Sequence, residues 1–371
     1  MALDVAAFTD TYLPTVNGVT YTIDLWRARW NEGHGRLDVV YPADSDYEPR
    51  ESEHPVRSVD LPIYRDQRLG RPRPPDDLPP PDIVHLHTPF TLGLAGLRYA
   101  SRCEVPTVAS YHTILAERIE RFVTGNRLAS TLEEVCHRYE AAIYDAVDLL
   151  ITPTPSARQY VRRTIGPDTE IRVVSNGIDT RLFRPVDSGD LEARYGIDGS
   201  RPLVGYTGRH SHEKHLSELV AAVDGMDVQL VLAGDGPART DLKQQAEGVD
   251  CEVVFPGFLD RGELPAFYSM LDVFAFCGRI ETQGLVALEA NACGTPVVAV
   301  DAGALAHTVV DGQTGYHYPP GDVAAFSEAI GRTITEVSRL REHCLERREL
   351  VSVEHTLDQL TRLYERLLDA G

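Results

Sequence analysis

Short apolar runs alternate with helical patterns along most of the 371-residue chain, and this alternation limits the possible folds more than any other feature. Repeated strand, helix and strand segments predict an open parallel sheet that helices cover on both faces. In the first half of the chain, strands are predicted at 3–8, 37–41, 82–87, 107–110, 149–152 and 173–174. In the second half, strands are predicted at 203–206, 228–233, 252–255, 273–276, 297–300 and 315–318. The sequence therefore predicts an α/β protein with two doubly wound, Rossmann-like sheets.

A stretch rich in Pro, Gly and Asp, residues 185–202, separates the two series of strands. Because the chain is long for one domain, we predict a first domain at 1–184, a second at 185–350 and a C-terminal helix within 351–371. Residues 43–80 are rich in Pro, Asp and Arg, which predicts loops and edge structure there. Helices are predicted at 19–30, 127–147, 322–349 and 354–369.

The chain carries 56 acidic against 36 basic residues, a formal net charge of -20. This charge disfavours nucleic acid and anionic membrane surfaces as general partners. Lys214 and Lys243 are the only lysines. An acidic, almost lysine-free composition is typical of proteins from a salt-rich cytoplasm, as in halophiles. A GC-rich acidic protein is the alternative explanation.

The six cysteines are scattered without a Cys-x-x-Cys pair, which predicts reduced, mostly buried thiols. The N-terminus has no basic stretch followed by a long apolar segment, so we expect no signal peptide. No apolar run approaches the roughly 18 residues that a membrane span requires. We therefore expect a cytoplasmic protein.

The stretch 279–296 combines an anion site with two carboxylates. A helix should begin near Gln283, because apolar residues recur at helical spacing after it. Glu281 lies just before this helix and Glu289 lies about two turns into it. Backbone amides at a helix start favour an anion, and the four amides expected here belong to Gln283, Gly284, Leu285 and Val286. Together these groups suit a nucleotide sugar, whereas the alternative is a solvated helix face.

Two further motifs follow predicted strands. In 10–19, Gly18 lets the backbone approach a ligand at the start of a helix, although Asn17-Gly18 is also an ordinary turn pair. In 208–214, Arg209 and Lys214 suit a diphosphate leaving group, although two basic residues often lie in a surface turn. Because this chain has so few lysines, Lys214 is expected to have a role that arginine cannot fill.

The string Glu281-Thr-Gln-Gly-Leu, with Glu289-Ala and then Gly294-Thr-Pro-Val-Val, resembles the signature of the retaining family-four glycosyltransferases. The resemblance covers nearly the whole chain except about 43–80, and Gly278-Arg279-Ile280 departs from the family pattern. It implies the GT-B fold, in which two domains face each other across a cleft and the last helix packs on the first domain.

The resemblance also implies a function. It implies transfer of a glucose- or mannose-type hexose from a nucleoside diphosphate sugar to a hydroxyl of a lipid or glycan acceptor, with an α-linkage. The glycolipid-forming and mannosyl-transferring branches are the most similar. A sugar-nucleotide epimerase of the same fold and a non-catalytic sugar-nucleotide-binding protein remain alternatives.

Residue roles are likewise implied by the resemblance. Glu289 is expected to bind the ribose and Glu281 the donor hexose, while Arg209 and Lys214 bind the leaving phosphates. His112 is expected beside the hexose, and together with Glu281, Arg209 and Lys214 it forms the predicted catalytic set. Further donor contacts are expected from Gly18, Phe258, Gln283, Gly284, Leu285 and Val286. The acceptor side is expected to include Asn17, His87, Phe90 and Tyr111.

The sequence offers less support for other kinds of site. The histidines at 85, 87, 210, 212 and 215 could bind a metal, but no Asp-x-Asp accompanies them, and we expect neither a metal nor another cofactor. No Gly-x-Gly-x-x-Gly follows a strand, which argues against a dinucleotide site.

Residues 114–123 have apolar positions at helical spacing with arginines between them. They predict either an ordinary packed helix or, by resemblance, a segment that docks the acceptor or the inner face of the membrane.

Overall fold

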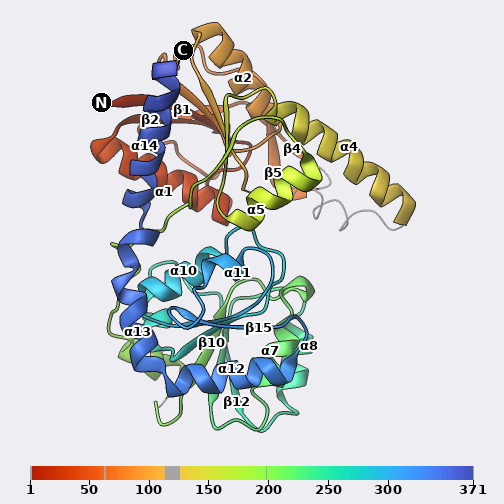
Figure 1. Ribbon diagram of the computed structural model, residues 1–371, viewed down its shortest axis with the longest axis vertical. Coiled ribbons are helices and arrows are strands. Elements are labelled where there is room, and N and C mark those ends of the chain that lie inside the picture. The colour runs from red at the N-terminus through yellow and green to blue at the C-terminus, as the bar shows by residue number, and fades with distance from the viewer. Residues whose placement is uncertain (1, 62–63, 113–125, 198, 371) are drawn as a thin grey trace. The chain divides into compact units, whose positions relative to one another are not determined.

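The computed structural model describes residues 2–61, 64–112, 126–197 and 199–370. The chain forms two compact units, Met1–Gly177 with Val353–Gly371, and Ile178–Ser352 (Figure 1). In the described ranges, no helix combines the length and the apolar character that a membrane crossing requires.

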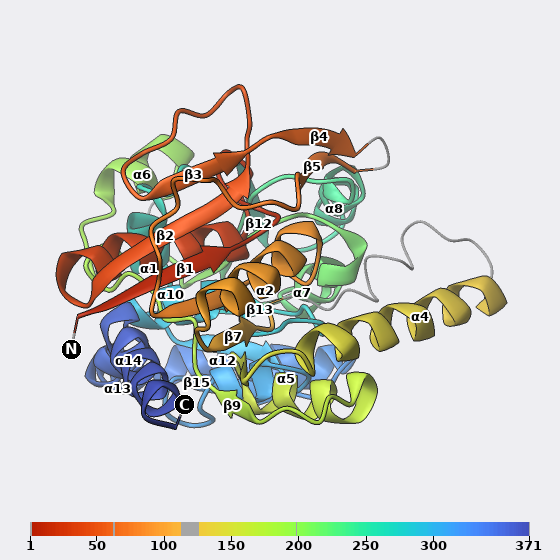
Figure 2. The ribbon, with the colours of Figure 1, turned by 90° about the horizontal axis from the view of Figure 1, so that it is seen from above.

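The first unit contains a parallel sheet of seven strands in the order β3-β2-β1-β6-β7-β8-β9. Its strands are β1 Leu3–Phe8, β2 Gly35–Pro42, β3 Glu53–Val56, β6 Ile83–Leu86, β7 Thr107–Ser110, β8 Leu149–Thr152 and β9 Ile171–Val173. An antiparallel hairpin of β4 (Ser58–Leu61) and β5 (Tyr64–Gly70) lies beside β2 (Figure 2). Thus the region predicted as loops and edge structure contributes the edge strand β3 and this hairpin.

Helices cover both faces of the first sheet. They are α1 Gly18–Gly33, α2 Thr91–Cys103, α4 Asn126–Tyr144, α5 Pro155–Tyr160, η1 Val161–Ile165 and α14 Val353–Ala370. The first unit has two hydrophobic cores, and alternate residues of β1 contribute to each. Val5 packs with α1 and α14, whereas Phe8 packs with α2 and α4. Helix α14 presents Leu357, Leu360 and Tyr364 on one buried face, and it packs against α1.

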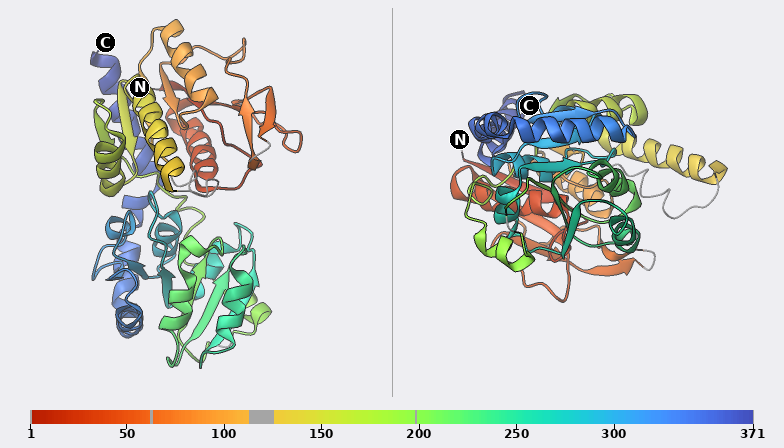
Figure 3. Two further views of the ribbon diagram at one scale, coloured as in Figure 1. Left: turned by 90° about the vertical axis from the view of Figure 1, so that its right-hand side faces the viewer. Right: turned by 90° about the horizontal axis from the view of Figure 1, so that it is seen from below.

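The second unit contains a parallel sheet of six strands in the order β12-β11-β10-β13-β14-β15. Its strands are β10 Leu203–Thr207, β11 Gln229–Ala233, β12 Glu252–Gly257, β13 Val273–Phe276, β14 Val297–Val300 and β15 Gly315–Tyr318. Its helices are α6 Gly189–Tyr195, η2 His212–Lys214, α7 Leu216–Ala222, α8 Arg239–Ala246, α9 Leu264–Met270, α10 Leu285–Ala292, α11 Leu305–Thr308, α12 Val323–Thr335, α13 Val337–Glu346 and η3 Arg348–Val351. Helices α7, α8 and α12 pack together, and α9, α10 and α13 form a second group. Figure 3 shows the unit from two further sides.

The two units meet in sequence at Gly177 and Ile178, not at residue 184. Phe183 is fully buried in the core of the second unit, and the Arg348 guanidinium donates hydrogen bonds to the Thr180 and Phe183 carbonyls. Residues 178–184 therefore pack in the second unit. The composition of the sequence does not show this side-chain burial.

Strand order reverses once in each sheet, between β1 and β6 in the first and between β10 and β13 in the second. In open parallel sheets, ligands bind beyond the carboxyl ends of the strands at such a reversal, the topological switch point. The loops after these four strands are therefore the first places to look for a functional site.

Candidate functional site

The loops after β10 and β13 are joined by an ion pair between Lys214 and Glu281. Lys214 ends η2, and Glu281 precedes α10. Both side chains are partly open, at 23% and 19% exposed. A Cβ atom at Gly278 would lie only 3.3 Å from Lys214 Cδ and 3.4 Å from Glu281 Oε1, so a glycine here leaves room for the pair. A cation and a carboxylate therefore lie together at the switch point of the second sheet, within reach of a ligand.

Backbone hydrogen bonds fix the loop that carries Arg209. His210 N donates to the Asp235 carbonyl at 2.8 Å, and Ala238 N donates to the His210 carbonyl at 2.9 Å. His210 itself is buried, which lowers its pKa. Arg209 is exposed, and its carbonyl accepts a hydrogen bond from Ser211 N at 3.1 Å, whereas its guanidinium makes no hydrogen bond or ion pair with the described part of the chain. The Arg209 guanidinium is therefore available to bind an anion, and backbone hydrogen bonds hold the loop that carries it.

Helix α10 begins at Leu285, two residues later than predicted, because Gly284 adopts a left-handed conformation with φ of 78°. A Cβ atom at Gly284 would lie 2.8 Å from Leu305 Cδ2, so both conformation and space favour glycine here. Leu285 and Val286 form the first turn, where backbone amides lack intrahelical partners. Gln283 is buried, and its carbonyl accepts a hydrogen bond from Thr308 Oγ1 at 2.5 Å.

Glu289 lies in α10, and its side chain is buried, at 7% exposed. Tyr268 Oη donates to Glu289 Oε2 at 2.9 Å, and an Arg261 terminal nitrogen lies 3.7 Å from Glu289 Oε1. Burial raises the pKa of Glu289, while Arg261 and the Tyr268 hydrogen bond act in the opposite direction. Arg261 and Tyr268 were not predicted from the sequence, because only the packing of α9 on α10 brings them to this carboxylate.

Phe258 follows β12 and is 70% exposed. The preceding Gly257 has φ of 86°. An exposed ring at the carboxyl end of a strand is accessible to a ligand of the second unit.

At the switch point of the first sheet, Asp10 joins β1 to the segment after β6. Its carboxylate accepts hydrogen bonds from Thr88 Oγ1 and Thr91 Oγ1, each at 2.7 Å, and from Leu92 N at 3.0 Å. Burial raises its pKa, and these hydrogen bonds oppose the shift. Asp10 therefore fixes the two loops against each other, a role that the sequence did not reveal.

Asn17 is the N-cap of α1, and Gly18 is the first residue of that helix. Asn17 Oδ1 accepts a hydrogen bond from Thr20 N at 2.9 Å, and its amide donates to Thr11 Oγ1 at 3.0 Å. These contacts stabilise the start of the helix. The Asn17 side-chain amide therefore stabilises the conformation of its own loop.

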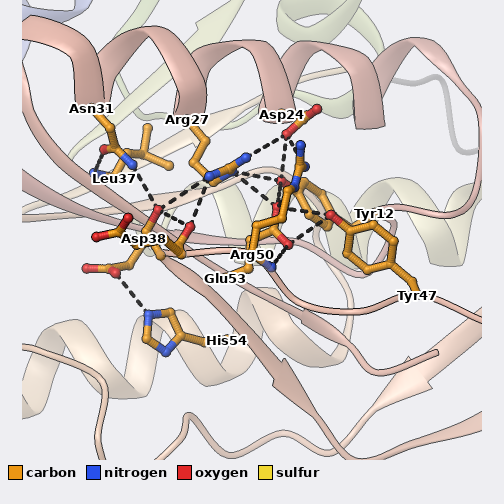
Figure 4. Close-up of polar contacts among 12 residues, drawn as sticks. Tyr12, Asp24, Arg27, Asn31, Leu37, Asp38, Tyr47, Arg50, Glu53 and His54 are labelled. Carbon is orange, nitrogen blue, oxygen red and sulfur yellow. Dashed lines mark hydrogen bonds and ion pairs between the residues drawn. The ribbon is translucent and has the colours of Figure 1, made fainter. Parts of the chain in front are cut away.

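Tyr12, in the same loop, is anchored by a buried network of charges (Figure 4). Its hydroxyl lies 3.1 Å from Glu53 Oε1, and Arg27 Nε lies 3.3 Å from the same oxygen. The fully buried Glu53 carboxylate also accepts hydrogen bonds from Arg50 N and Tyr47 Oη, both at 2.9 Å. The network ties the loop between β1 and α1 to the edge strand β3.

His112 and His87 are buried and hydrogen-bonded to each other, with 2.9 Å between His112 Nε2 and His87 Nδ1. The His87 ring stacks on the ring of His85, with 4.3 Å between centroids. Burial lowers the pKa of His112 to about 4 and that of His85 to about 3, so both are neutral near pH 7. Both ring nitrogens of His85 have protein partners, Tyr364 Oη at 2.6 Å and Ser110 Oγ at 2.7 Å.

The remaining predicted acceptor-side residues differ in exposure. Phe90 is half-buried at the N-cap of α2. Tyr111 is only 1% exposed, and its ring packs near those of Tyr144 and Tyr160 in the core. Its predicted place on the acceptor side stays a prediction. The predicted docking segment 114–123 lies outside the described residues.

Two family models match this chain. The model described as Glycosyltransferase Family 4 matches residues 16–182, and the model described as Glycosyl transferases group 1 matches residues 187–349. The alpha-monoglucosyldiacylglycerol synthase of Streptococcus pneumoniae is 29% identical over 362 residues, covering 92% of this chain and 80% of that protein. A GDP-mannose-dependent alpha-mannosyltransferase of Mycolicibacterium smegmatis is 30% identical over 351 residues, covering 90% and 88%. The structure of sucrose-phosphate synthase from Thermosynechococcus elongatus matches with a TM-score of 0.79 at 24% identity, covering 99% of each chain.

The structural likeness, with two parallel-sheet units, confirms the predicted GT-B fold class. The chain belongs to the glycosyltransferases of group 1 and family 4. It is therefore an enzyme, a hexosyltransferase, and the comparisons favour neither the epimerase nor the non-catalytic alternative.

Proposed function

We propose that this enzyme transfers a glucose- or mannose-type hexose from a nucleoside diphosphate sugar to a hydroxyl of a lipid or glycan acceptor, with retention and formation of an α-bond. The names of the relatives support this range, since one makes a glucosyldiacylglycerol and another uses GDP-mannose. The observation that carries the proposal is the ion pair of Lys214 with Glu281 at the switch point, beside the start of α10.

On the donor side, Arg209 and Lys214 would bind the diphosphate and stabilise the charge that grows on it as the glycosidic bond breaks. The first-turn amides of Leu285 and Val286 would add hydrogen bonds to the phosphates. Glu281 would accept hydrogen bonds from hexose hydroxyls. A donor phosphate would compete with Glu281 for the Lys214 ammonium, and the released carboxylate would then be free to bind the sugar.

The nucleoside would be bound by two other groups. We propose that Glu289 accepts hydrogen bonds from ribose hydroxyls and that the backbone near Phe258 contacts the base. Since the diphosphate would be neutralised by an arginine and a lysine, we propose that transfer requires no metal.

From the first unit, His112 would hydrogen-bond to the transferred hexose as a neutral imidazole, and Gly18 would allow close approach to the donor. A neutral group there would not oppose the positive charge that develops on the sugar in the transition state. Asn17, His87 and Phe90 are proposed to shape the acceptor side. For a lipid acceptor, we propose peripheral association with the inner face of the membrane.

The test is a transfer assay with UDP, GDP and ADP derivatives of glucose and mannose, each with and without a diacylglycerol or glycan acceptor. We expect nucleoside diphosphate release only in the presence of acceptor, and an α-configured product by NMR. A folded Glu281→Gln variant should give lower turnover in the same assay. Release without acceptor, conversion of one donor sugar into another, or a β-linked product would contradict the proposal.

A further inference from the structure

In the part of the chain that the structure describes, the buried carboxylate of Glu289 has one protein group near each of its oxygens, and both groups come from the segment around α9. Tyr268 Oη donates to Oε2 at 2.9 Å, and an Arg261 terminal nitrogen lies 3.7 Å from Oε1. The first distance is a hydrogen bond, whereas the second exceeds one. Tyr268 therefore occupies Oε2, while Arg261 acts on Oε1 through its charge and leaves that oxygen able to accept a hydrogen bond from a ligand.

Arg261 is positioned by aromatic rings. Its guanidinium carbon lies 5.2 Å from the centroid of the Phe183 ring, and the Phe183 and Tyr268 rings lie 6.0 Å apart. Both aromatic side chains are fully buried. Cation–π attraction and packing thus hold the guanidinium beside Glu289.

The other arginines on elements that pack against α10 make different contacts. Arg341 of α13 donates to the Gly294 and Leu271 carbonyls, and Arg348 of η3 donates to backbone carbonyls of the segment before α6. The Cys293 thiol, one turn along α10, is neutral because burial raises its pKa to about 12. A buried carboxylate without a compensating partner would take up a proton. Among the described residues, Arg261 and Tyr268 are the groups that lower the pKa of Glu289 and so favour its ionised form.

We propose that Arg261 and Tyr268 are positioning residues that hold Glu289 as an oriented carboxylate, and that they thereby set the preference for a ribonucleotide over a deoxyribonucleotide. This inference rests on the proposed function, in which Glu289 binds the ribose. Tyr268 fixes the plane of the carboxylate, and Arg261 supplies the charge that makes the bond from a ribose hydroxyl a charge-assisted one.

The first measurement is calorimetric binding of UDP, GDP and ADP, with the tightest of the three then compared with its 2′-deoxy analogue. Tyr268→Phe removes a single hydroxyl, and Arg261→Gln removes the charge. Each change should weaken binding of the ribonucleotide by about five- to tenfold and reduce the preference over the deoxy analogue. Arg261→Lys should recover most of the affinity. Either change combined with Glu289→Gln should add little further loss, since both act through Glu289.

A second cluster of Arg, Tyr and Glu side chains, outside the proposed donor site, offers a control. The Arg332 guanidinium lies 3.9 Å from the centroid of the Tyr316 ring, and the Tyr316 hydroxyl donates a hydrogen bond to Glu336 at 2.9 Å. Arg332→Gln and Tyr316→Phe should leave nucleotide affinity unchanged.

The second measurement is the pH dependence of the ratio between variant and wild-type dissociation constants. Loss of the Arg261 charge would raise the pKa of Glu289 further, so the loss of affinity in Arg261→Gln should grow as pH falls. Ionisation of the ligand phosphate is common to both proteins and cancels in the ratio. A purely structural defect would give a ratio that does not change with pH.

The outcomes separate this inference from the proposed function. If Glu289→Gln leaves ribonucleotide affinity unchanged, the donor assignment itself fails. If Glu289→Gln weakens binding while folded Tyr268→Phe and Arg261→Gln bind as wild type, only the positioning role is overturned. A full additional loss from Arg261→Gln on top of Glu289→Gln would show that Arg261 contacts the ligand directly, which also overturns it.

Discussion

Replacement of Lys214 by arginine keeps the positive charge but changes its shape. The lysine stem passes Gly278 closely, and its ammonium pairs with Glu281 while remaining partly exposed. A guanidinium is planar, wider and spreads its charge over a fork. In this narrow space, we expect Lys214→Arg to place the charge away from the position that the departing phosphate requires.

The size of the effect follows from what the charge does. Complete removal of a group that stabilises transition-state charge typically lowers the rate by about 10²- to 10³-fold. Because a misplaced charge retains part of this effect, we expect Lys214→Arg to lower kcat by at least about tenfold. The donor KM should change less, since the leaving-group charge is largest in the transition state.

Steady-state transfer kinetics with the preferred donor would measure this effect, and thermal unfolding would check the fold. Lys243→Arg is the matched control, because Lys243 is exposed on α8 and its ammonium lies 5.7 Å from the Phe255 ring, a contact that arginine also makes. A normally folded Lys214→Arg enzyme with the wild-type kcat would refute the leaving-group role.

Three other predictions concern different parts of the molecule. Transfer should survive exhaustive treatment with EDTA; loss of activity that magnesium or manganese restores would contradict the metal-free proposal. Glu289→Gln should weaken nucleoside diphosphate binding by about 1–3 kcal/mol, whereas Glu281→Gln should spare that affinity and lower turnover; equal effects in calorimetry would show that the roles are misassigned. Burial raises the pKa of Glu140, on α4, from 4.5 to about 8, so within this range the folded protein holds a proton that the unfolded chain releases. Stability should therefore fall as pH rises through this range, and Glu140→Gln should reduce that slope in thermal unfolding.

The elements that positioned the proposed donor site could be predicted because their signals are local. The predicted strand 273–276 coincides with β13, and the predicted helix after it begins two residues late, where Gly284 turns left-handed. Hydrophobic periodicity reports how a segment buries its own side chains, and it needs no knowledge of distant partners. By contrast, the predicted helix 322–349 is divided into α12, α13 and η3, which begin at Val323, Val337 and Arg348.

Contacts between segments far apart in the chain could not be predicted in this way. Glu53 lies in the region predicted as loops and edge structure, but the sequence did not show that its carboxylate accepts a hydrogen bond from Tyr12, in the loop before α1. Tyr111 was predicted from its place after a strand, and only the structure shows that its ring packs among buried residues of the first unit. A pattern of polar and apolar residues does not show which of two sheet faces, or which distant carboxylate, a side chain will meet.

Sequence alone thus determined the family signature, the two series of strands and the identity of Glu281, Glu289, Arg209 and Lys214 as candidates. Only the tertiary structure decided that Lys214 pairs with Glu281 and that Arg261 and Tyr268 flank Glu289. The physical reason is that motifs and periodicity are encoded in neighbouring residues, whereas these pairs form only when strand order and helix packing bring separate loops to one edge of the sheet.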